Sequence, residues 1–201
     1  VLYARVLEAR ERIAADGTVV EPLDEASLAR ELALARGAGL RAVAIALLHS
    51  VVRPDHERRA AALARAAGFE EVVVSHVVAP LVGLVARGDS AVADAYLSPV
   101  LLRHLAAFRA ELAARHGEPP LLLMQSNGGL VDPQGFRGID SVLSGPAGGV
   151  VGLAEVGRAA SCERVIGLDM GGTSTDVSLY AGTLPRRYST EIDGVRLQAP
   201  M

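Results

Sequence analysis

Residues 165–179 read VIGLDMGGTSTDVSL, which is an apolar strand, a turn of glycine and hydroxyl residues, and a second strand. In the turn, Gly171 and Gly172 stand between two acidic residues, Asp169 and Asp176. Adjacent glycines let the backbone turn and approach a ligand closely, because they carry no Cβ. The residues after the turn alternate with a period of two, which predicts a strand and therefore a β-hairpin.

This turn has the groups of a phosphate–metal site. Consecutive backbone N–H groups form an anion-binding concavity, and the hydroxyls of Thr173, Ser174 and Thr175 add donors. Carboxylates on either side are suited to hold Mg²⁺, or its waters, against a phosphate. A Walker loop would need a lysine and a helix after the turn, and a Rossmann turn would need a helix. The alternative is an ordinary Gly-Gly hairpin tip without a ligand.

A second glycine-rich stretch precedes the hairpin, and residues 144–154 read SGPAGGVVGLA. Glycine costs roughly 1 kcal/mol relative to alanine inside a helix, so several together need a reason. Gly145, Gly149 and Gly152 recur at helical spacing, which predicts one smooth face open to a ligand or a second backbone. A glycine-rich loop without helical structure is the alternative.

Composition limits the class of protein. The 201 residues are 50% hydrophobic and 21% charged with a net charge of −3, which gives no basic excess for nucleic acid. The single cysteine, Cys162, excludes a disulfide framework and suggests a cytoplasmic protein. No apolar run reaches the roughly 18 residues that a membrane span needs. The first residue is Val1, and we expect the chain to be a piece of a longer protein.

Strand and helix patterns alternate along the rest of the chain. We expect a hairpin turning at Asp16-Gly17, a helix capped by Asp24, strands at 42–48, 72–74 and 121–124, and helices from Pro54 and over 89–115. This order predicts an α/β fold with a parallel or mixed sheet and helices on its faces. The long helix is expected to bury Leu97, Leu101, Leu105, Phe108 and Leu112, unless Ser98-Pro99 starts a second helix.

Other polar residues have two readings each. Gln125, Ser126 and Asn127 follow a strand beside two glycines, where ligand contacts and a simple turn are equally plausible. We interpret His49 as a structural histidine and residues 57–59 as a solvated helix face. His104 and His116 lack a partner at the spacing of a zinc site.

Taken in order, these segments resemble the actin, sugar-kinase and heat-shock chaperone ATPase superfamily. More closely, the chain resembles the hydantoinase A/oxoprolinase family, which includes N-methylhydantoinase, 5-oxoprolinase and acetone-carboxylase-type subunits. The matching segments are ALLHS at 46–50 with Pro54 and HERR at 56–59, DAYLSP at 94–99, MQSNGG at 124–129, LSGPAGGV at 143–150, and 169–177.

The resemblance implies an incomplete actin-like ATPase (ribonuclease H-like) fold. Residues 1–88 would be the C-terminal part of the family's N-terminal region, and 89–201 the N-terminal part of the hydantoinase A domain. A connecting helix at about 144–160 would lead to the second phosphate hairpin at 165–180. The first phosphate loop and the adenosine-contacting segment are expected outside these residues, so the fragment alone is expected to be inactive. The stretch from Arg87 to Val92 departs from the family's arginine–hydroxyl pattern, which weakens any role for that loop.

The resemblance also implies roles for the site residues. Asp169 would hold the Mg²⁺ of ATP, and Asp176 would orient a water or the acceptor. The β- and γ-phosphates would contact the turn and the connecting helix, through Gly171, Gly172, Thr173, Ser174, Thr175, Gly145, Gly148 and Gly149. Gln125, Ser126 and Asn127 are the candidates for substrate contacts.

In family terms, ATP would phosphorylate an amide or imide oxygen of a cyclic substrate so that water can open the ring. The expected partners are that small molecule and a second, hydantoinase B-like subunit, with no nucleic acid and no membrane. Two alternatives stay open. One is an acetone- or acetophenone-carboxylase-type subunit, and the other is a non-catalytic actin-like nucleotide-binding module.

Overall fold

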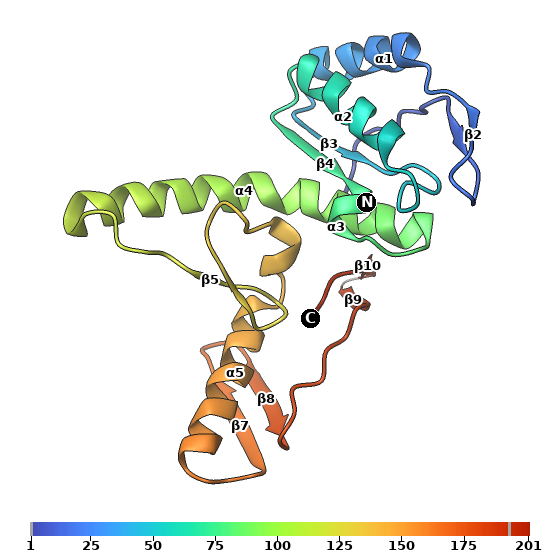
Figure 1. Ribbon diagram of the computed structural model, residues 1–201. Coiled ribbons are helices and arrows are strands. Elements are labelled where there is room, and N and C mark those ends of the chain that lie inside the picture. Colours follow the sequence, from blue (N-terminus) through green and yellow to red (C-terminus); the bar gives the residue numbers. More distant parts are fainter. Residues whose placement is uncertain (1, 193) are drawn as a thin grey trace.

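The computed structural model describes residues 2–192 and 194–201, and its N-terminal part is a small α/β unit (Figure 1). The elements of this unit are β1 (Arg12–Ile13), β2 (Val19–Glu21), α1 (Glu25–Gly37), β3 (Ala42–Ile45), α2 (Asp55–Ala66), β4 (Glu71–Val74) and α3 (Ser75–Val78). β3 and β4 pair in parallel, with α2 as the crossover between them. Helices α1 and α2 lie on one side of this pair, and the long helix α4 (Leu84–His116) lies on the other.

Local signals set the boundaries of α1 as predicted. The Asp24 side chain accepts a hydrogen bond from the Ser27 amide at 3.0 Å, which caps the first turn. Leu28 and Leu32 then lie on the buried face of the helix. They form a core with Ile45 of β3 and the alanines of α2, so the parallel strand pair is covered by both helices.

α4 runs without interruption through Pro99, so Ser98-Pro99 does not start a second helix. Proline removes one backbone hydrogen bond, but the turn before it is anchored from outside the helix. Gly138 donates to Ser98 Oγ at 3.0 Å, and Ile139 donates to Asp94 Oδ1 at 2.9 Å. These contacts anchor the turn of α4 that precedes Pro99 to the following segment.

Two predictions for α4 were wrong. The stretch from Arg87 to Val92, treated as a loop in the comparison with the family although 89–92 were also placed in the predicted helix, is helical throughout. The predicted buried stripe holds in full only at Leu105, whereas Phe108 is exposed. The C-terminal half of α4 projects beyond the N-terminal unit, so it has few elements to pack against (Figure 1).

The C-terminal part packs against α4 through a short 3₁₀ turn, η1. Its elements are β5 (Leu123–Met124), β6 (Leu130–Val131), η1 (Gly138–Ser141), α5 (Ser144–Ala159), β7 (Val165–Met170), β8 (Thr175–Tyr180), β9 (Thr190–Ile192) and β10 (Val195–Leu197). Ile139 of η1 and Leu197 of β10 share a core with Ala91 and Ala95 of α4. In the described part of the chain the strands form two-stranded ladders, of which β3–β4 is parallel and the others antiparallel. The fold is therefore mixed α/β, with α4 rather than a continuous sheet joining its parts.

The glycines of α5 differ in what surrounds them. A Cβ on Gly157 would lie 2.5 Å from Cγ2 of Val165, whereas a Cβ on Gly152 or Gly145 would meet nothing within 4 Å. The predicted smooth face at 145, 149 and 152 is therefore not where the strands approach most closely. The hairpin packs tightest at Gly157, near the C-terminal end of the helix.

This difference predicts opposite effects of the same substitution on one helix. Gly157→Ala should destabilise the fold by about 1–3 kcal/mol, because the added methyl overpacks the contact with Val165. Gly152→Ala should stabilise it by up to about 1 kcal/mol, because it removes a helix-interior glycine at an open position. Urea denaturation of both variants tests this, and two effects of the same sign would contradict it.

Asp94 gives a pH-dependent prediction. Its side chain is 3% exposed, and burial raises its pKa above the usual 3.8, although hydrogen bonds from Ile139 and Ser98 oppose the shift. Because the folded-state pKa is raised, the ionised form costs stability as the pH rises through it. Asp94→Asn keeps an oxygen for both hydrogen bonds. We expect its stability to match that of the wild type at about pH 3, where the carboxyl is protonated in both states, and to exceed it at neutral pH. Urea denaturation at both pH values measures this difference, and one that does not change with pH would contradict it.

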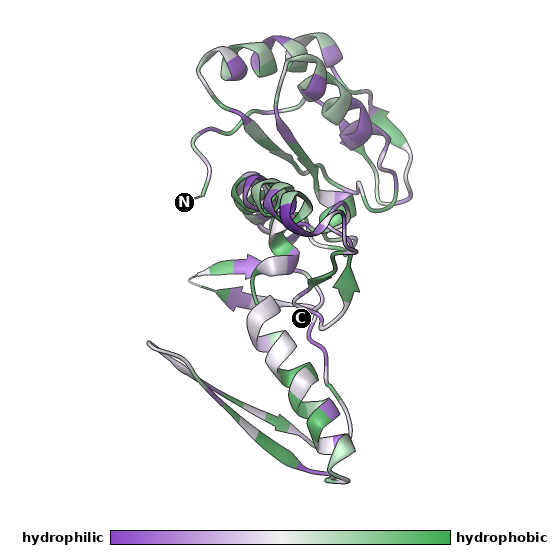
Figure 2. Ribbon diagram, turned by 90° about the vertical axis from the view of Figure 1, so that its left-hand side faces the viewer, coloured by the Kyte–Doolittle hydropathy of each residue, from purple (hydrophilic) through white to green (hydrophobic). Residues whose placement is uncertain are grey.

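The outer face of the β7–β8 hairpin is apolar and uncovered (Figure 2). Five side chains on this face are between 65% and 80% exposed, namely Ile166, Leu168, Met170, Val177 and Leu179. Contiguous apolar surface of this kind drives association. We expect the 201-residue chain to self-associate and Leu168→Glu to weaken this association at least about tenfold. Sedimentation velocity measures the change, with exposed Val85→Glu on α4 as the matched control.

Candidate phosphate-binding site

The predicted hairpin is present, with β7 and β8 antiparallel and a tip at residues 171–174. The Gly171 amide donates to the Ser174 carbonyl at 2.9 Å and closes the tip. Neither Gly171 nor Gly172 is among the described residues with positive φ, so the turn does not require glycine for its backbone angles. A Cβ on Gly172 would meet nothing within 4 Å. The backbone at Gly172 is therefore open to its surroundings, and the turn itself does not require glycine there.

Asp169 and Asp176 are cross-strand partners at the end of the hairpin. Their neighbours on the same face are the pair Gly167–Ser178, and a Cβ on Gly167 would lie 2.9 Å from Leu153 of α5. This face therefore looks toward α5. Like charges directly opposite each other on a sheet repel, and a cation between them relieves the repulsion.

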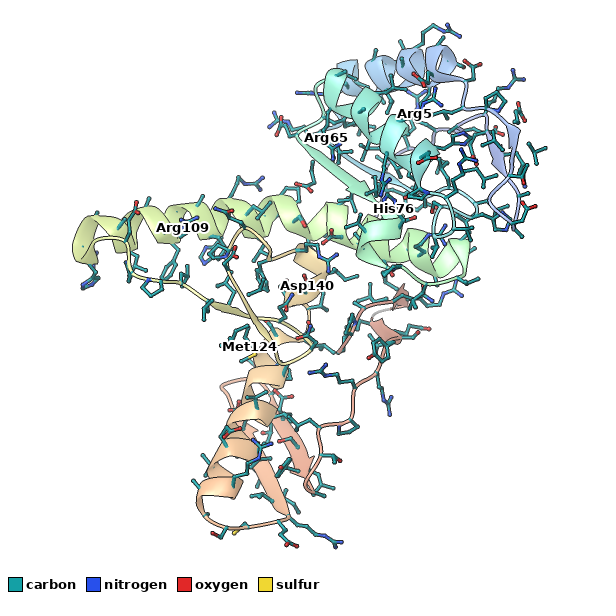
Figure 3. All side chains as sticks on the ribbon, in the orientation of Figure 1. Arg5, Arg65, His76, Arg109, Met124 and Asp140 are labelled. Atoms are coloured by element: carbon teal, nitrogen blue, oxygen red, sulfur yellow. The ribbon has the colours of Figure 1, made fainter. Side chains whose placement is uncertain are left out.

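The N-terminal half of α5 completes this region. A Cβ on Gly149 would lie 3.9 Å from Asp169 Oδ2, so a predicted glycine of the helix and the predicted metal residue face each other. The Asp169 carboxylate thus lies beside the second turn of α5. Gly145 stands open in the first turn, whereas a Cβ on Gly148 would lie 3.6 Å from Met124 (Figure 3).

The three hydroxyl residues of the turn do not lie on one face of the hairpin. Thr173 and Ser174 are exposed at the tip. Thr175 is the cross-strand partner of Met170 and therefore lies on the opposite face from Asp176. A ligand held between the hairpin and α5 would meet the first two hydroxyls and not the third.

The loop at 125–127 uses two of its three polar side chains internally. Ser126 is buried; its hydroxyl donates to the Asp140 carbonyl at 2.8 Å and accepts from the Leu143 amide at 2.9 Å. Asn127 accepts from the Gly129 amide at 2.6 Å, which closes a turn. Within the described residues the Gln125 side chain makes no hydrogen bond, so all of its polar atoms, and the Asn127 Nδ2 group, are available to a ligand.

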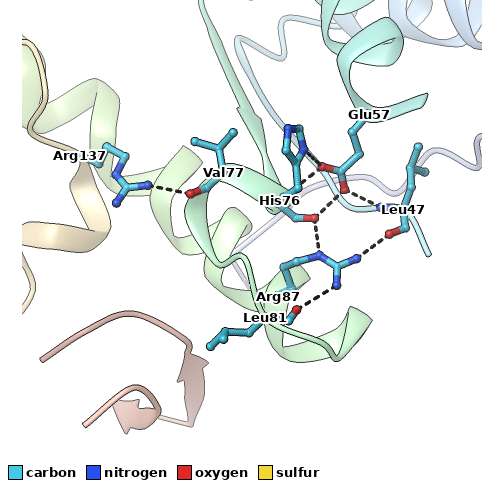
Figure 4. Close-up of polar contacts among 8 residues, drawn as sticks. Leu47, Glu57, His76, Val77, Leu81, Arg87 and Arg137 are labelled. Atoms are coloured by element: carbon cyan, nitrogen blue, oxygen red, sulfur yellow. Dashed lines mark hydrogen bonds and ion pairs between the residues drawn. The ribbon is translucent and has the colours of Figure 1, made fainter. Parts of the chain in front are cut away.

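A buried polar network at the start of α4 was missed by the sequence analysis (Figure 4). Glu57 is fully buried, which contradicts the predicted solvated face, and it accepts hydrogen bonds from the Leu47 amide, Ser75 Oγ, the His76 amide and His76 Nδ1. Arg87 donates to Ser75 Oγ and to the carbonyls of Leu47 and Leu81. One signal was available, because Glu57 shares a helical face with Ala60 and Ala64.

His49 has the structural role that the sequence predicted. His49 Nδ1 lies 2.7 Å from the Ile13 carbonyl, a structural contact. Over the described ranges, no group of three or more His, Cys, Asp or Glu side chains is arranged for a metal ion. A metal between the hairpin carboxylates would therefore depend on oxygens of a bound ligand. Among the same residues, no helix has both the length and the apolar character to cross a membrane.

Two family sequence profiles match the chain. The profile described as hydantoinase/oxoprolinase matches residues 87–201, and that of the hydantoinase/oxoprolinase N-terminal region matches residues 1–68. The chain belongs to the hydantoinase/oxoprolinase family. The hairpin and α5, which carried much of the resemblance, both lie within the range that the hydantoinase/oxoprolinase profile matches.

Individual relatives agree. The chain is 43% identical to 5-oxoprolinase of Saccharomyces cerevisiae over 90% of its own length and 14% of that protein. It is 33% identical to the acetophenone carboxylase gamma subunit of Aromatoleum aromaticum over 92% of its length and 26% of that protein. The chain therefore spans about a quarter of one of these curated relatives and less of the other.

Solved structures give the same fold. The ATP-dependent caprolactamase of Pseudomonas jessenii superposes with a TM-score of 0.85 and 34% identity, over 96% of this chain and 28% of that one. The nucleotide-free acetone carboxylase superposes with a TM-score of 0.84 at 24% identity, over 96% of this chain and 28% of that one. The latter supports the fold alone. The family and the incomplete α/β fold predicted from the sequence are confirmed.

Proposed function

We propose that this chain supplies one phosphate-binding half of an ATP-dependent enzyme that opens a cyclic amide or imide. The observation that carries the proposal is the cross-strand pair Asp169–Asp176 near the tip of a hairpin, with Asp169 Oδ2 beside Gly149 of α5. The relatives that include 5-oxoprolinase and an ATP-dependent caprolactamase support the reaction class.

The residues present fit Mg-ATP. Mg²⁺ is commonly held by one or two carboxylates together with substrate phosphates, and the hairpin offers two carboxylates, with no third protein ligand beside them among the described residues. We assign Asp169 to the metal, because its Oδ2 is the carboxylate oxygen beside α5. Mg²⁺ would neutralise charge on the phosphates during phosphoryl transfer.

The other residues then have positional roles. The backbone at Gly172 and the hydroxyls of Thr173 and Ser174 would donate to the phosphate oxygens, since they stand at the open tip. Asp176 would orient the water or the acceptor. Phosphorylation of the amide oxygen makes the ring carbon a better electrophile, so that water can open the ring.

A second subunit is also part of the proposal. The relative from Pseudomonas jessenii is named as the alpha subunit of caprolactamase, and the chain is 37% identical to it over 85% of its own length and 25% of that protein. We propose a partner subunit of the hydantoinase B type. Cytoplasmic location remains a prediction from the cysteine content.

A chimaera tests the function. The 201 residues would replace the aligned segment of the caprolactamase alpha subunit, and caprolactam-dependent ATP hydrolysis would be measured with its beta subunit present. We expect the chimaera to hydrolyse ATP in response to caprolactam or another cyclic amide. A chimaera that binds Mg-ATP without any substrate-stimulated hydrolysis would favour the non-catalytic module.

The carboxylase alternative is favoured by one observation, the 33% identity to the acetophenone carboxylase gamma subunit. It predicts ATP hydrolysis that depends on a ketone and bicarbonate rather than on a cyclic amide. The corresponding chimaera in the acetophenone carboxylase gamma subunit separates the two reactions by their substrates.

A further inference from the structure

The hydroxyl of Ser126 links η1 to the residue that precedes α5. It donates a hydrogen bond to the Asp140 carbonyl of η1 at 2.8 Å and accepts one from the Leu143 amide at 2.9 Å. The Ser126 amide also donates to the Asp140 carbonyl, at 2.7 Å. Ser126 is only 4% exposed, so these hydrogen bonds are shielded from water. Ser126 therefore holds the start of α5 against η1.

Helix α5 has no cap of its own. Leu143 occupies the N-cap position, and its apolar side chain makes no capping hydrogen bond. In a capping box, the side chain of a Glu or Gln inside the helix accepts a hydrogen bond from the N-cap amide. For α5 this acceptor is Ser126, which lies 17 residues earlier in the chain. The start of α5 is therefore fixed by a residue outside the helix.

η1 is in turn fixed on α4. The amides of Gly138 and Ile139 donate to the side chains of Ser98 and Asp94. A Cβ on Gly138 would lie 2.6 Å from the Ser98 amide nitrogen, so the two segments are in close contact. Because Ser126 ties α5 to η1, it also fixes the start of α5 relative to α4.

The loop that carries Ser126 packs along α5 as well. A Cβ on Gly148 would lie 3.6 Å from Met124 Cγ, and a Cβ on Gly128 would lie 3.1 Å from Val151 Cγ2. Gly148 and Val151 are about one helical turn apart, so the loop follows the first turns of the helix. A shift of α5 would therefore move the helix relative to this loop.

We propose that Ser126 is a positioning residue of the phosphate site, which acts through α5 and does not touch the substrate. Gly148 contacts the loop, and the next residue, Gly149, lies beside Asp169 Oδ2. The first two turns of α5 thus lie between the loop and the carboxylate that we assign to the metal. The inference rests on the proposed function. It replaces the substrate contact that the sequence suggested for Ser126.

Amide hydrogen exchange tests whether Ser126 holds α5. The protein is the 201-residue chain with Leu168→Glu, which weakens the predicted association through the outer face of the hairpin. Ser126→Ala should speed exchange of the Leu143 amide at least about tenfold, because this amide loses its acceptor. The amide of Ala154, a buried residue in the middle of α5, should change by less than about twofold.

Ser141→Ala is the matched control. The Ser141 hydroxyl donates to the Gly138 carbonyl at 2.7 Å, so its loss removes a hydrogen bond within η1 and leaves the link to α5 intact. We expect the exchange rate of Leu143 to stay within about twofold of the parent rate. Ser126→Cys keeps a side chain of similar size with only weak hydrogen bonds, and it is the second variant should Ser126→Ala not fold.

Steady-state kinetics of the caprolactamase chimaera test the consequence for the reaction. Ser126→Ala should lower kcat of cyclic-amide-dependent ATP hydrolysis about 10–100-fold and leave the KM for Mg-ATP within about threefold. The reason is that the groups in contact with ATP remain and only their alignment is lost. Rates are expressed per Mg-ATP site counted by calorimetry, so that a smaller folded fraction does not lower kcat. Ser141→Ala should leave both constants within about twofold.

Three results would overturn the inference while the proposed function stands. The first is an unchanged exchange rate of Leu143 in the Ser126→Ala chain. The second is an equal kcat for the Ser126→Ala and Ser141→Ala chimaeras. The third is a raised KM for Mg-ATP without loss of kcat, because that pattern belongs to a residue that contributes to binding. A parent chimaera without cyclic-amide-dependent hydrolysis would instead overturn the proposed function, and the positioning role with it.

Discussion

Asp169→Asn should reduce substrate-dependent ATP hydrolysis of the caprolactamase chimaera by about 10²–10³-fold, because it removes a charge that holds the metal against the phosphates. Its Oδ2 lies beside Gly149, so the substitution keeps the shape of the site and changes mainly its charge. Steady-state ATPase assays over a range of Mg²⁺ concentrations measure the effect. A partial rescue at high Mg²⁺ is expected, since the weakened site still offers Asp176.

The control for this prediction is Glu163→Gln, a change of the same chemistry at an exposed position between α5 and β7. It should leave turnover within about twofold, because it removes a surface charge outside the site. Equal activity of the Asp169→Asn and Glu163→Gln chimaeras would remove Asp169 from the metal site.

Arg87→Met should lower the free energy of unfolding by about 3–5 kcal/mol, the range for breaking a buried charge network by deleting one member. Arg87 is 2% exposed and joins Leu47 at the end of β3, Ser75 at the start of α3 and Leu81 in one network with Glu57 (Figure 4). Burial lowers the pKa of the Arg87 guanidinium, and the Glu57 charge opposes that shift. Without the Arg87 guanidinium, the buried Glu57 carboxylate has lost a nearby positive charge. The Leu47 and Leu81 carbonyls each lose a hydrogen-bond donor.

Urea denaturation measures this loss. Arg109→Met is the matched control, because Arg109 lies exposed on the same helix (Figure 3). Glu57→Gln combined with Arg87→Met should recover part of the stability, because neither charge is then buried alone. Equal stability of the Arg87→Met and Arg109→Met variants would show that the network contributes little.

Elements with strong local signals were predictable. The strands of the hairpin follow from a period of two on either side of a Gly-Gly turn, and α1 follows from its cap and its apolar face. Both depend on interactions within a few residues. Local rules failed at Pro99, because the hydrogen bonds that hold α4 through this position come from residues 138 and 139.

The candidate site, too, was predictable in part. Its residues were named from the sequence, since acid, glycine and hydroxyl residues fall within eight positions. The sequence did not show on which face of the hairpin each of these residues lies, because that depends on the register of strand pairing. Asp169 opposes Asp176 and Thr175 opposes Met170, and a shift of one residue would exchange the two faces.

The sequence by itself therefore determined the family, the order of the main helices and strands as far as the β7–β8 hairpin, and the chemical groups of the phosphate site. Tertiary structure alone decided that Glu57 is buried against Ser75 and His76, that Asp169 faces Gly149, and that Ser126 links η1 to the start of α5. The physical reason is the separation along the chain between the residues that interact. Caps, turns and periodicity act between residues close in the chain, whereas burial and strand pairing depend on which distant segments meet.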